Sequence, residues 1–239
     1  MTRIALITGG SRGLGRATAL ALADSGVDVL ITYRTGASEA ADVVAAVEAA
    51  GRRAVALPLE TTDLGSHATF ADAVRSALRD VWSRDTIDVL VNNAGSSGET
   101  PLGATDADEV QRLFDVHVLS VVMLTQELLP LIADGGRILN VSTGLTVNLV
   151  NPAYSVYAAM KGAVEVYSRY LATSLGSRGI AGSTCWRPAQ PPRTSRAATS
   201  ATTSSTASAS RRPAPWAGSV SPTTSVAPPR RSSPRVWAG

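Results

Sequence analysis

Several residue types that mark other classes of protein are rare in this 239-residue chain. Cys185 is the only cysteine, so a disulfide within the chain is excluded and a reducing compartment is acceptable. The two histidines, His67 and His117, lie far apart and lack the spacing of a zinc or other metal site. We therefore expect no metal ion in this protein.

Long uninterrupted hydrophobic runs are also missing. Residues 1–7 form too short an apolar run for a signal peptide. The longest apolar stretch, residues 116–133, is interrupted by polar residues and by Pro130, which indicates a core helix rather than a membrane span. We expect a cytoplasmic protein with no membrane partner.

Acidic residues and lysine are absent from residues 182–239, where eight arginines give a charge of +8. Residues 1–181 carry −5, so the net charge of +3 conceals a mildly acidic N-terminal part. Residues 182–239 also hold twenty serines and threonines and nine of the thirteen prolines, a composition typical of a disordered tail. The prediction is one domain over 1–181 and a low-complexity tail over 182–239. Because neither lysine nor regular aromatic residues accompany the tail arginines, we expect no nucleic-acid partner.

The chain has one lysine against twenty-one arginines, and this Lys161 follows Tyr157 by four residues. Four residues make about one helical turn, so the two side chains project from the same face. A phenol titrates near 10 and is a poor acid at neutral pH, but a neighbouring cation favours the phenolate and lowers its pKa. The pair therefore indicates acid–base chemistry, the alternative being a chance pair on a solvated helix.

Apolar runs of strand length alternate with helical segments along residues 1–181. The expected strands are 4–8, 27–33, 53–59, 87–92 and 137–142, and the expected helices are 15–25, 38–50, 66–83, 106–132 and 154–177. Strands that alternate with helices predict parallel pairing and a sheet covered on both faces. The predicted fold class is α/β, a Rossmann-type doubly wound parallel sheet in three layers.

A glycine-rich loop, TGGSRGLG at residues 8–15, directly follows the first expected strand and leads into a helix. Glycines let the backbone turn sharply and approach a pyrophosphate, whose charge is favoured at a helix N-terminus. The loop predicts a dinucleotide site, and a purely structural turn is the alternative. Its candidate cofactor-binding residues are Gly9, Ser11, Arg12, Gly13, Leu14 and Gly15.

This loop and four later features together resemble the classical short-chain dehydrogenase/reductase family, over roughly residues 3–181. Asn92-Asn93-Ala94-Gly95 follows the fourth strand as the family's NNAG motif does, and Ser142 and Thr143 end the fifth strand. The Tyr157-x-x-x-Lys161 pair lies downstream, and residues 174–180 resemble the end of the family's long helix and the start of its sixth strand. The members most similar in pattern are the 3-oxoacyl-acyl-carrier-protein reductases.

The resemblance implies a nicotinamide dinucleotide as cofactor, and the end of the second strand indicates which one. Dinucleotide sites that favour NAD place an acid there, whereas this chain has Tyr33 and Arg34. With Arg12 nearby, two guanidinium groups could bind a 2′-phosphate, so we expect NADP(H) in preference to NAD(H). Glu60 stands where the family usually has an aspartate against the adenine, and Asn93, Ala94 and Gly95 complete the expected cofactor contacts.

The implied reaction is hydride transfer between nicotinamide and a carbonyl or secondary alcohol. Tyr157 would donate the proton, while Lys161 would hold the nicotinamide ribose and depress the tyrosine pKa. Thr143 aligns best with the family's serine, which hydrogen-bonds the carbonyl oxygen, and Ser142 is the alternative. His117 stands where the family has an asparagine that supports a relay water, and it is either catalytic or a core histidine. His67 is expected on a helix surface.

The tail is compatible with the family's missing segment when its codons are read in a different frame, although the code forces only three of the matching residues. Read one base out of phase, the codons from Cys185 to Ser195 are compatible with L-A-P-G-x-x-x-T-D-F, the segment that follows the sixth strand in the family. The codons from Trp216 onward allow G-R-V-G-E-P-D-D-I, similar to the stretch before the family's last helix. These matches predict a frameshift just after Ala181.

A frameshift would replace the sixth and seventh strands, the last helix and the loop over the substrate. The activity of the chain as written is therefore open. The substrate is expected to be a small carbonyl or alcohol, or an acyl-carrier conjugate. The alternative function is a catalytically impaired nucleotide-binding remnant. Assembly as a homo-oligomer is expected through the long helix from Tyr154 to Ser177.

Overall fold

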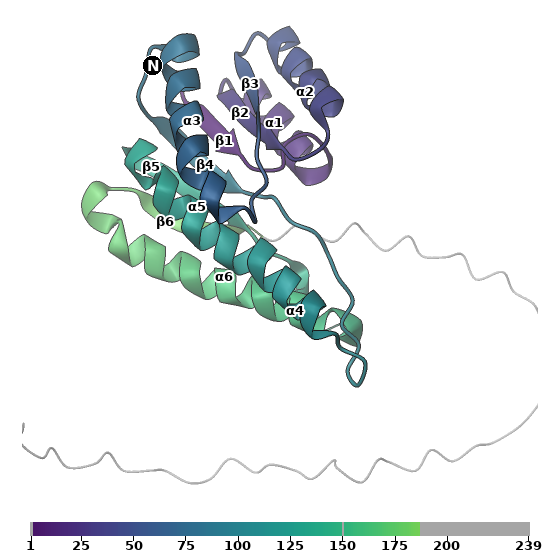
Figure 1. The fold of residues 1–239 in the computed structure, drawn as a ribbon. Coiled ribbons are helices and arrows are strands. Elements are labelled where there is room, and N and C mark those ends of the chain that lie inside the picture. Colours follow the sequence, from purple (N-terminus) through teal and green to yellow (C-terminus); the bar gives the residue numbers. More distant parts are fainter. Residues whose placement is uncertain (1, 150, 187–239) are drawn as a thin grey trace, which may run out of the picture. The chain divides into compact units, whose positions relative to one another are not determined.

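The structure, a computed structural model, describes residues 2–149 and 151–186. Six parallel strands form one sheet in the order β3-β2-β1-β4-β5-β6 (Figure 1). The order reverses between β1 and β4, which is the switch point of a doubly wound sheet. The strands are β1 (Ile4–Ile7), β2 (Asp28–Tyr33), β3 (Ala54–Pro58), β4 (Ile87–Asn92), β5 (Ile132–Val141) and β6 (Ala181–Trp186).

Helices cover both faces of the sheet, which confirms the predicted three-layer Rossmann-type class. On one face, α1 (Gly13–Asp24) and α2 (Ala37–Ala49) pack in a cluster with β1 and β2. On the other face lie α3 (His67–Trp82), α5 (Ser120–Leu128) and α6 (Ser155–Ser174). The remaining helical segments are α4 (Ala107–Phe114), η1 (Leu64–Ser66), η2 (Asp115–Leu119), η3 (Leu129–Leu131), η4 (Gly144–Thr146), η5 (Pro152–Tyr154) and η6 (Gly176–Arg178).

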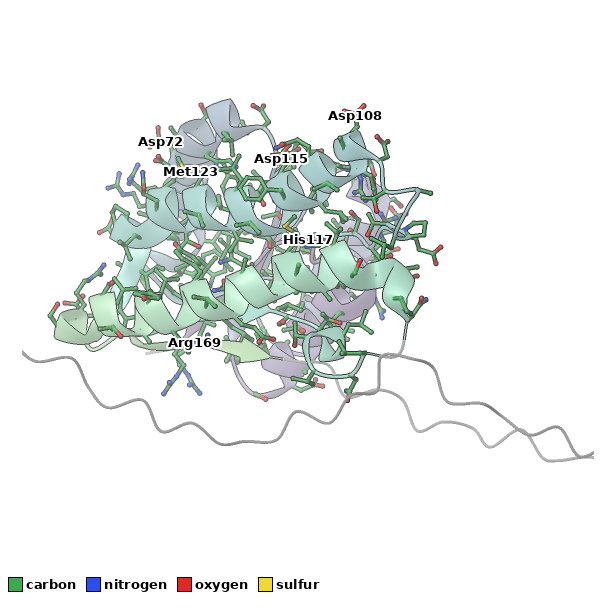
Figure 2. All side chains as sticks on the ribbon, turned by 90° about the horizontal axis from the view of Figure 1, so that it is seen from below. Asp72, Asp108, Asp115, His117, Met123 and Arg169 are labelled. Carbon is green, nitrogen blue, oxygen red and sulfur yellow. The ribbon has the colours of Figure 1, made fainter. Side chains whose placement is uncertain are left out.

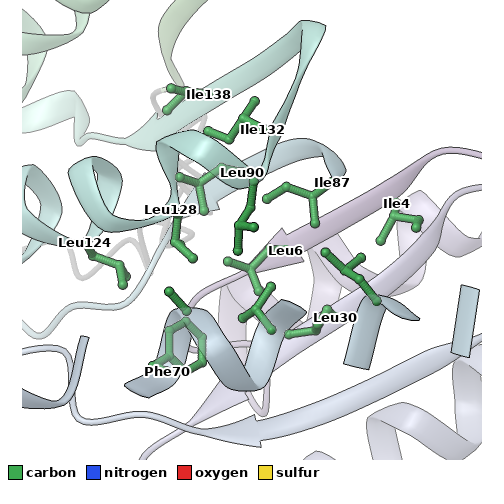
Figure 3. Packing of buried hydrophobic residues seen from close by; sticks show 14 of the residues in the cluster. Ile4, Leu6, Leu30, Phe70, Ile87, Leu90, Leu124, Leu128, Ile132 and Ile138 are labelled. Carbon is green, nitrogen blue, oxygen red and sulfur yellow. The ribbon is translucent and has the colours of Figure 1, made fainter. Parts of the chain in front are cut away.

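The central strands are apolar at nearly every position because neither of their faces meets water. All four residues of β1 are fully buried. Ile4 and Leu6 belong to the cluster that α3 and α5 complete, whereas Ile7 belongs to the cluster under α1 and α2. Figure 3 shows the first cluster, in which Phe70 and Leu124 approach the strand residues from the two helices.

The helix expected over residues 106–132 is one continuous helical stretch of varying pitch. It begins as α4, widens into the π-helical turn η2 at Asp115–Leu119, and continues as α5 and η3. By length and composition alone, Ala107–Leu131 could cross a membrane, because an 18-residue window within it has a mean hydropathy of 1.3. The core helix of a soluble protein passes the same test, and Leu124 and Leu128 of this stretch belong to the core.

The sixth strand is present, contrary to the expectation that the altered sequence after Ala181 removes it. Residues Ala181–Trp186 pair in parallel with β5, with Arg137 opposite Ala181 and Val141 opposite Trp186. A strand ladder is built from backbone groups that every residue except proline supplies, and none of these six residues is a proline. The predicted loss of the seventh strand and the last helix falls in the tail, outside the described residues.

His67 is buried, with 1% of its surface exposed, although it was expected on a helix surface. It is the first residue of α3, and its Nε2 lies 2.9 Å from the backbone oxygen of Thr61. The ring therefore folds under the turn that follows β3 instead of facing water. The helical pattern did not reveal this because a first-turn side chain packs against the preceding loop, whose path depends on the tertiary fold.

Candidate active site

One cleft of about 980 Å³ lies where the carboxyl ends of β1, β2, β4 and β5 meet. Ligands of open α/β sheets bind at this edge, next to the switch point. The cleft brings together every residue that the sequence analysis selected. These residues are Gly9, Ser11, Arg12, Gly13, Leu14, Gly15, Tyr33, Arg34, Glu60, Asn93, Ala94, Gly95, His117, Ser142, Thr143, Tyr157 and Lys161.

The loop between β1 and α1 has the shape that a pyrophosphate requires. Gly9 and Gly13 adopt positive φ angles of 65° and 56°, a region that favours glycine. A Cβ on Gly15 would lie 2.2 Å from the backbone oxygen of Gly9, so the helix can approach the loop only with glycine there. Arg12 caps α1 without a side-chain hydrogen bond, and the first turn carries no acid. The N-terminus of α1 is therefore suited to an anion, and these residues fit a dinucleotide.

Asn93 fastens this loop to the end of β4. Its Nδ2 donates to the backbone oxygens of Thr8, at 2.8 Å, and Gly9, at 3.1 Å. In return, the Thr8 hydroxyl accepts from the backbone N–H groups of Asn93 and Ala94, both at 2.9 Å. The Asn93 side chain thus holds the backbone of the glycine loop in place through hydrogen bonds. The sequence analysis missed Thr8, whose role depends on a partner 85 residues away.

Thr143 is the hydroxyl next to Tyr157. Burial of the phenol raises the pKa of Tyr157 above its ordinary 10.0, although a hydrogen bond with Thr143 acts to lower it. This direction is opposite to the depression expected from Lys161. The phenol therefore keeps its proton at neutral pH, which is the state that a proton donor needs.

Lys161 is buried, with 5% of its surface exposed, and its ammonium donates a 2.7 Å hydrogen bond to the backbone oxygen of Val141. The bond ties α6 to the end of β5. The Lys161 ammonium also contributes, after burial, to lowering the pKa of His117. Lys161 and Tyr157 both line the cleft from α6, as their four-residue spacing predicted.

Ser142 has a different partner from its neighbour Thr143. Its hydroxyl donates a 2.7 Å hydrogen bond to Glu165 Oε1. The same carboxylate oxygen accepts from Thr146 at 2.9 Å, so Glu165 holds the chain on both sides of Thr143. Glu165 was not predicted from the sequence, although it lies one helical turn after Lys161.

His117 lies in the π-helical turn η2, and Figure 2 shows it between α6 and the stretch that runs from α4 into α5. Its ring packs edge-on against Tyr157, with centroids 5.1 Å apart and planes at 81°. Burial, together with the charge of Lys161, lowers the pKa of His117 to about 4, so the imidazole is neutral. Because the Ser96 backbone oxygen, 2.6 Å from Nε2, can only accept, Nε2 carries the hydrogen and Nδ1 is an acceptor.

That acceptor, His117 Nδ1, is buried and has no hydrogen-bond partner within residues 2–149 and 151–186. The ring edge that carries it faces Gly95, where a Cβ would lie 2.7 Å from Cε1 and 3.2 Å from Nδ1. A buried acceptor without a donor is costly, which points to a water or a hydroxyl bound at this position. Whether His117 is catalytic or structural, its imidazole is neutral and its Nδ1 can accept a hydrogen bond.

Arg112 forms a part of the cleft wall that the sequence analysis missed. It donates to the Ser96 hydroxyl at 2.6 Å and to the Ser97 backbone oxygen at 3.3 Å, and it pairs with Glu109. These bonds hold the segment after β4 against α4. In the part of the chain that the structure describes, no group of three or more His, Cys, Asp or Glu residues could hold a metal ion.

Comparison with known proteins identifies the family. The family model described as short chain dehydrogenase matches residues 3–188, more than three quarters of the chain. The protein therefore belongs to the short-chain dehydrogenase family, a family of oxidoreductases. The match ends within eight residues of the point where the sequence composition changes.

Individual relatives agree with this assignment. A 3-oxoacyl-acyl-carrier-protein reductase from Synechocystis is 36% identical over 180 residues, which cover 74% of this chain and 70% of the relative. An uncharacterized oxidoreductase from Methylorubrum extorquens is 35% identical over 178 residues, 74% of this chain and 69% of the relative. The chain thus spans about seven tenths of these relatives.

Two solved structures are similar in fold and sequence. The landomycin C-6 ketoreductase LanV, with bound NADP and rabelomycin, gives a TM-score of 0.71 at 34% identity, covering 77% of this chain and 74% of LanV. A short-chain dehydrogenase from Burkholderia cenocepacia in complex with NADP gives 0.68 at 37% identity, covering 75% and 70%.

Proposed function

We propose that this protein is an NADP(H)-dependent reductase that interconverts a ketone or 3-oxoacyl group and a secondary alcohol. The observation that carries this proposal is the arrangement of Tyr157, Thr143 and Lys161 in the same cleft as the glycine loop at the N-terminus of α1. The ketoreductase and 3-oxoacyl reductase names of similar proteins support it. The substrate would be a small carbonyl or alcohol, or an acyl-carrier conjugate.

NADP(H) is favoured over NAD(H) by the charges at the adenosine end of the cleft. Arg12 and Arg34 both line it, and β2 ends at Tyr33 without a carboxylate. Guanidinium groups bind phosphate through charge-assisted and often bidentate bonds. The bound cofactor supplies or accepts the hydride, and the protein's own task is to orient and polarise the substrate.

The side chains divide the remaining work. During reduction, the carbonyl carbon accepts the hydride and its oxygen takes the proton of the neutral Tyr157 phenol, which gives the secondary alcohol. The Thr143 hydroxyl would hydrogen-bond the same oxygen and stabilise its developing charge. Lys161 would hold the nicotinamide ribose from the floor of the cleft. His117, neutral and with Nδ1 free to accept, would support a water that passes a proton back towards Lys161.

Assembly with a second copy would use α6. Val166 and Tyr170 are large and exposed on this helix, at 44% and 71% of their surface. Exposed apolar residues gathered on one element favour burial against a partner. The long helix would therefore form the contact in a homo-oligomer.

The test is oxidation of NADPH by the full chain with a panel of small ketones and a 3-oxoacyl thioester. We expect ketone-dependent loss of NADPH, abolished in Tyr157→Phe, with NADPH affinity in that variant unchanged. The conservative variant keeps the ring and its packing against His117. A loss of turnover with intact NADPH binding can therefore be attributed to the missing phenol proton. Dinucleotide binding without turnover on any substrate would instead identify the nucleotide-binding remnant. Full activity of Tyr157→Phe would overturn the proton-donor assignment.

A further inference from the structure

An ion pair closes the adenosine end of the cleft. Arg34 follows β2 and Glu60 follows β3, and these neighbouring strands are in register up to Tyr33 and Pro58 (Figure 1). Arg34 Nη1 lies 3.6 Å from Glu60 Oε2, and both residues line the cleft. The cation best placed for a 2′-phosphate thus already has an anion beside it.

The two partners are held to different degrees. Glu60 Oε1 accepts from the backbone N–H of Thr62, at 3.2 Å, and from its hydroxyl, at 2.9 Å. The intervening Thr61 contributes its backbone oxygen to the contact with buried His67. The Arg34 side chain, in contrast, is 65% exposed. The Glu60 carboxylate, on a side chain that is 40% exposed, is therefore the better held partner, and the Arg34 guanidinium has more freedom to move.

A carboxylate at this place acts on a 2′-phosphate in two ways. It occupies one edge of the Arg34 guanidinium, and it repels a second anion brought within a few ångströms. Exposed ion pairs are weak, so a phosphate can displace the carboxylate from Arg34, although the competition lowers its affinity. A ribose 2′-hydroxyl meets no such repulsion and can instead donate to a carboxylate.

We propose that Glu60 is a specificity-determining residue that competes with the 2′-phosphate for Arg34 and so limits the preference for NADP(H) over NAD(H). This inference rests on the dinucleotide site of the proposed function but not on carbonyl chemistry. It assigns Glu60 a charge-based role that is separate from any contact with the adenine ring. It also makes cofactor preference a property of two side chains on adjacent strands.

The experiment measures binding of adenosine 2′,5′-bisphosphate and adenosine 5′-monophosphate to the full chain by titration calorimetry. These two ligands differ only in the 2′-phosphate. Glu60→Gln keeps an oxygen for the two Thr62 bonds and removes the charge. We expect it to bind the bisphosphate roughly three- to fivefold tighter, the size of effect that an exposed ion pair supports, with no gain in affinity for the monophosphate. The gain should shrink as salt screens the charges.

Two further variants distinguish an effect of the Arg34–Glu60 ion pair from a general effect of net charge. Asp80→Asn removes one exposed negative charge from α3, outside the cleft, and should leave both affinities unchanged. In an Arg34→Gln background, which weakens bisphosphate binding, Glu60→Gln should give a clearly smaller gain than in the wild type. An equal gain in both backgrounds, an equal gain for both ligands, or no gain at all would overturn the proposal.

Failure here and failure of the proposed function give different results. A chain that binds the bisphosphate with the predicted Glu60 dependence but reduces no ketone disproves the reductase and keeps this inference. A chain that reduces ketones, but in which Glu60→Gln leaves the bisphosphate affinity unchanged, disproves this inference and keeps the reductase. Absence of binding by both nucleotides in the wild type would disprove both.

Discussion

The hydroxyl of Ser142 donates a 2.7 Å hydrogen bond to Glu165, a residue on the helix that carries Tyr157 and Lys161. The adjacent hydroxyl, on Thr143, is instead the one hydrogen-bonded to Tyr157. Thr143 Oγ1 also accepts from the Leu145 backbone N–H, at 3.3 Å, which leaves its hydrogen free to donate towards the phenol. Two neighbouring hydroxyls thus have separate partners.

We expect Thr143→Ala and Ser142→Ala to fail in different ways. Loss of one donor to a developing oxyanion reduces kcat roughly 10²–10³-fold, so Thr143→Ala should lower kcat on that scale while Thr143→Ser keeps most activity. Ser142→Ala should retain most of kcat and lose about 1 kcal/mol of unfolding free energy with its hydrogen bond. Steady-state kinetics and urea unfolding of the three variants measure both effects. A larger kcat loss in Ser142→Ala would transfer the substrate-facing role to Ser142.

Gly15 provides a test of the phosphate loop that needs only binding. An added methyl would lie 2.2 Å from the Gly9 oxygen and 2.6 Å from Asn93 Nδ2, and crowding of this kind costs about 1–3 kcal/mol. Gly15→Ala should therefore weaken NADPH binding, measured by fluorescence, roughly tenfold or more. Gly162→Ala is the matched control, because nothing lies within 4 Å of a methyl there. Equal affinity in Gly15→Ala and the wild type would remove the loop from the site.

His117 makes stability depend on pH. Its pKa falls from 6.5 in the unfolded chain to about 4 in the folded protein, so between these values the unfolded chain binds more protons. The unfolding free energy is therefore highest, with respect to His117, above pH 6.5, and it decreases as the pH falls from 6.5 towards 4. The shift corresponds to roughly 3 kcal/mol.

Urea unfolding across this pH range, in the wild type and in His117→Asn, isolates the contribution of His117. We expect the unfolding free energy of the wild type to decline more steeply with falling pH than that of the variant. His67 is present in both proteins, so its own titration cancels from the difference. Parallel curves would show that the buried imidazole does not titrate as described.

The parts of the fold that were predicted correctly are those that local sequence determines. The glycine loop, the NNAG segment and the Tyr157/Lys161 spacing each fix a backbone path or a helix face within a few residues. Short apolar runs separated by helices were sufficient for the sheet class and for most strand positions. The family assignment followed from the order of these local features and was confirmed by the comparisons.

The errors concern properties that arise only when distant segments pack. The pKa of Tyr157 moves upward because the folded cleft desolvates the phenol, an effect that a four-residue spacing does not contain. Burial of His67 and the partnership of Ser142 with Glu165 depend on contacts that the helix pattern leaves open. The strand at Ala181–Trp186 pairs with β5 through backbone groups, which every residue of this segment supplies.

The nucleotide sequence of the gene can test the origin of the tail. If a frameshift follows Ala181, an independent nucleotide read across codons 178–186 should reveal one base gained or lost relative to the present frame. The corrected chain should continue with L-A-P-G and T-D-F after the sixth strand, and the family match, which now ends at residue 188, should extend towards its C-terminus. Restoring that segment should raise ketone-dependent NADPH oxidation, because the loop that covers the substrate in the family returns with it. An unshifted read would establish the arginine-rich sequence as this protein's own.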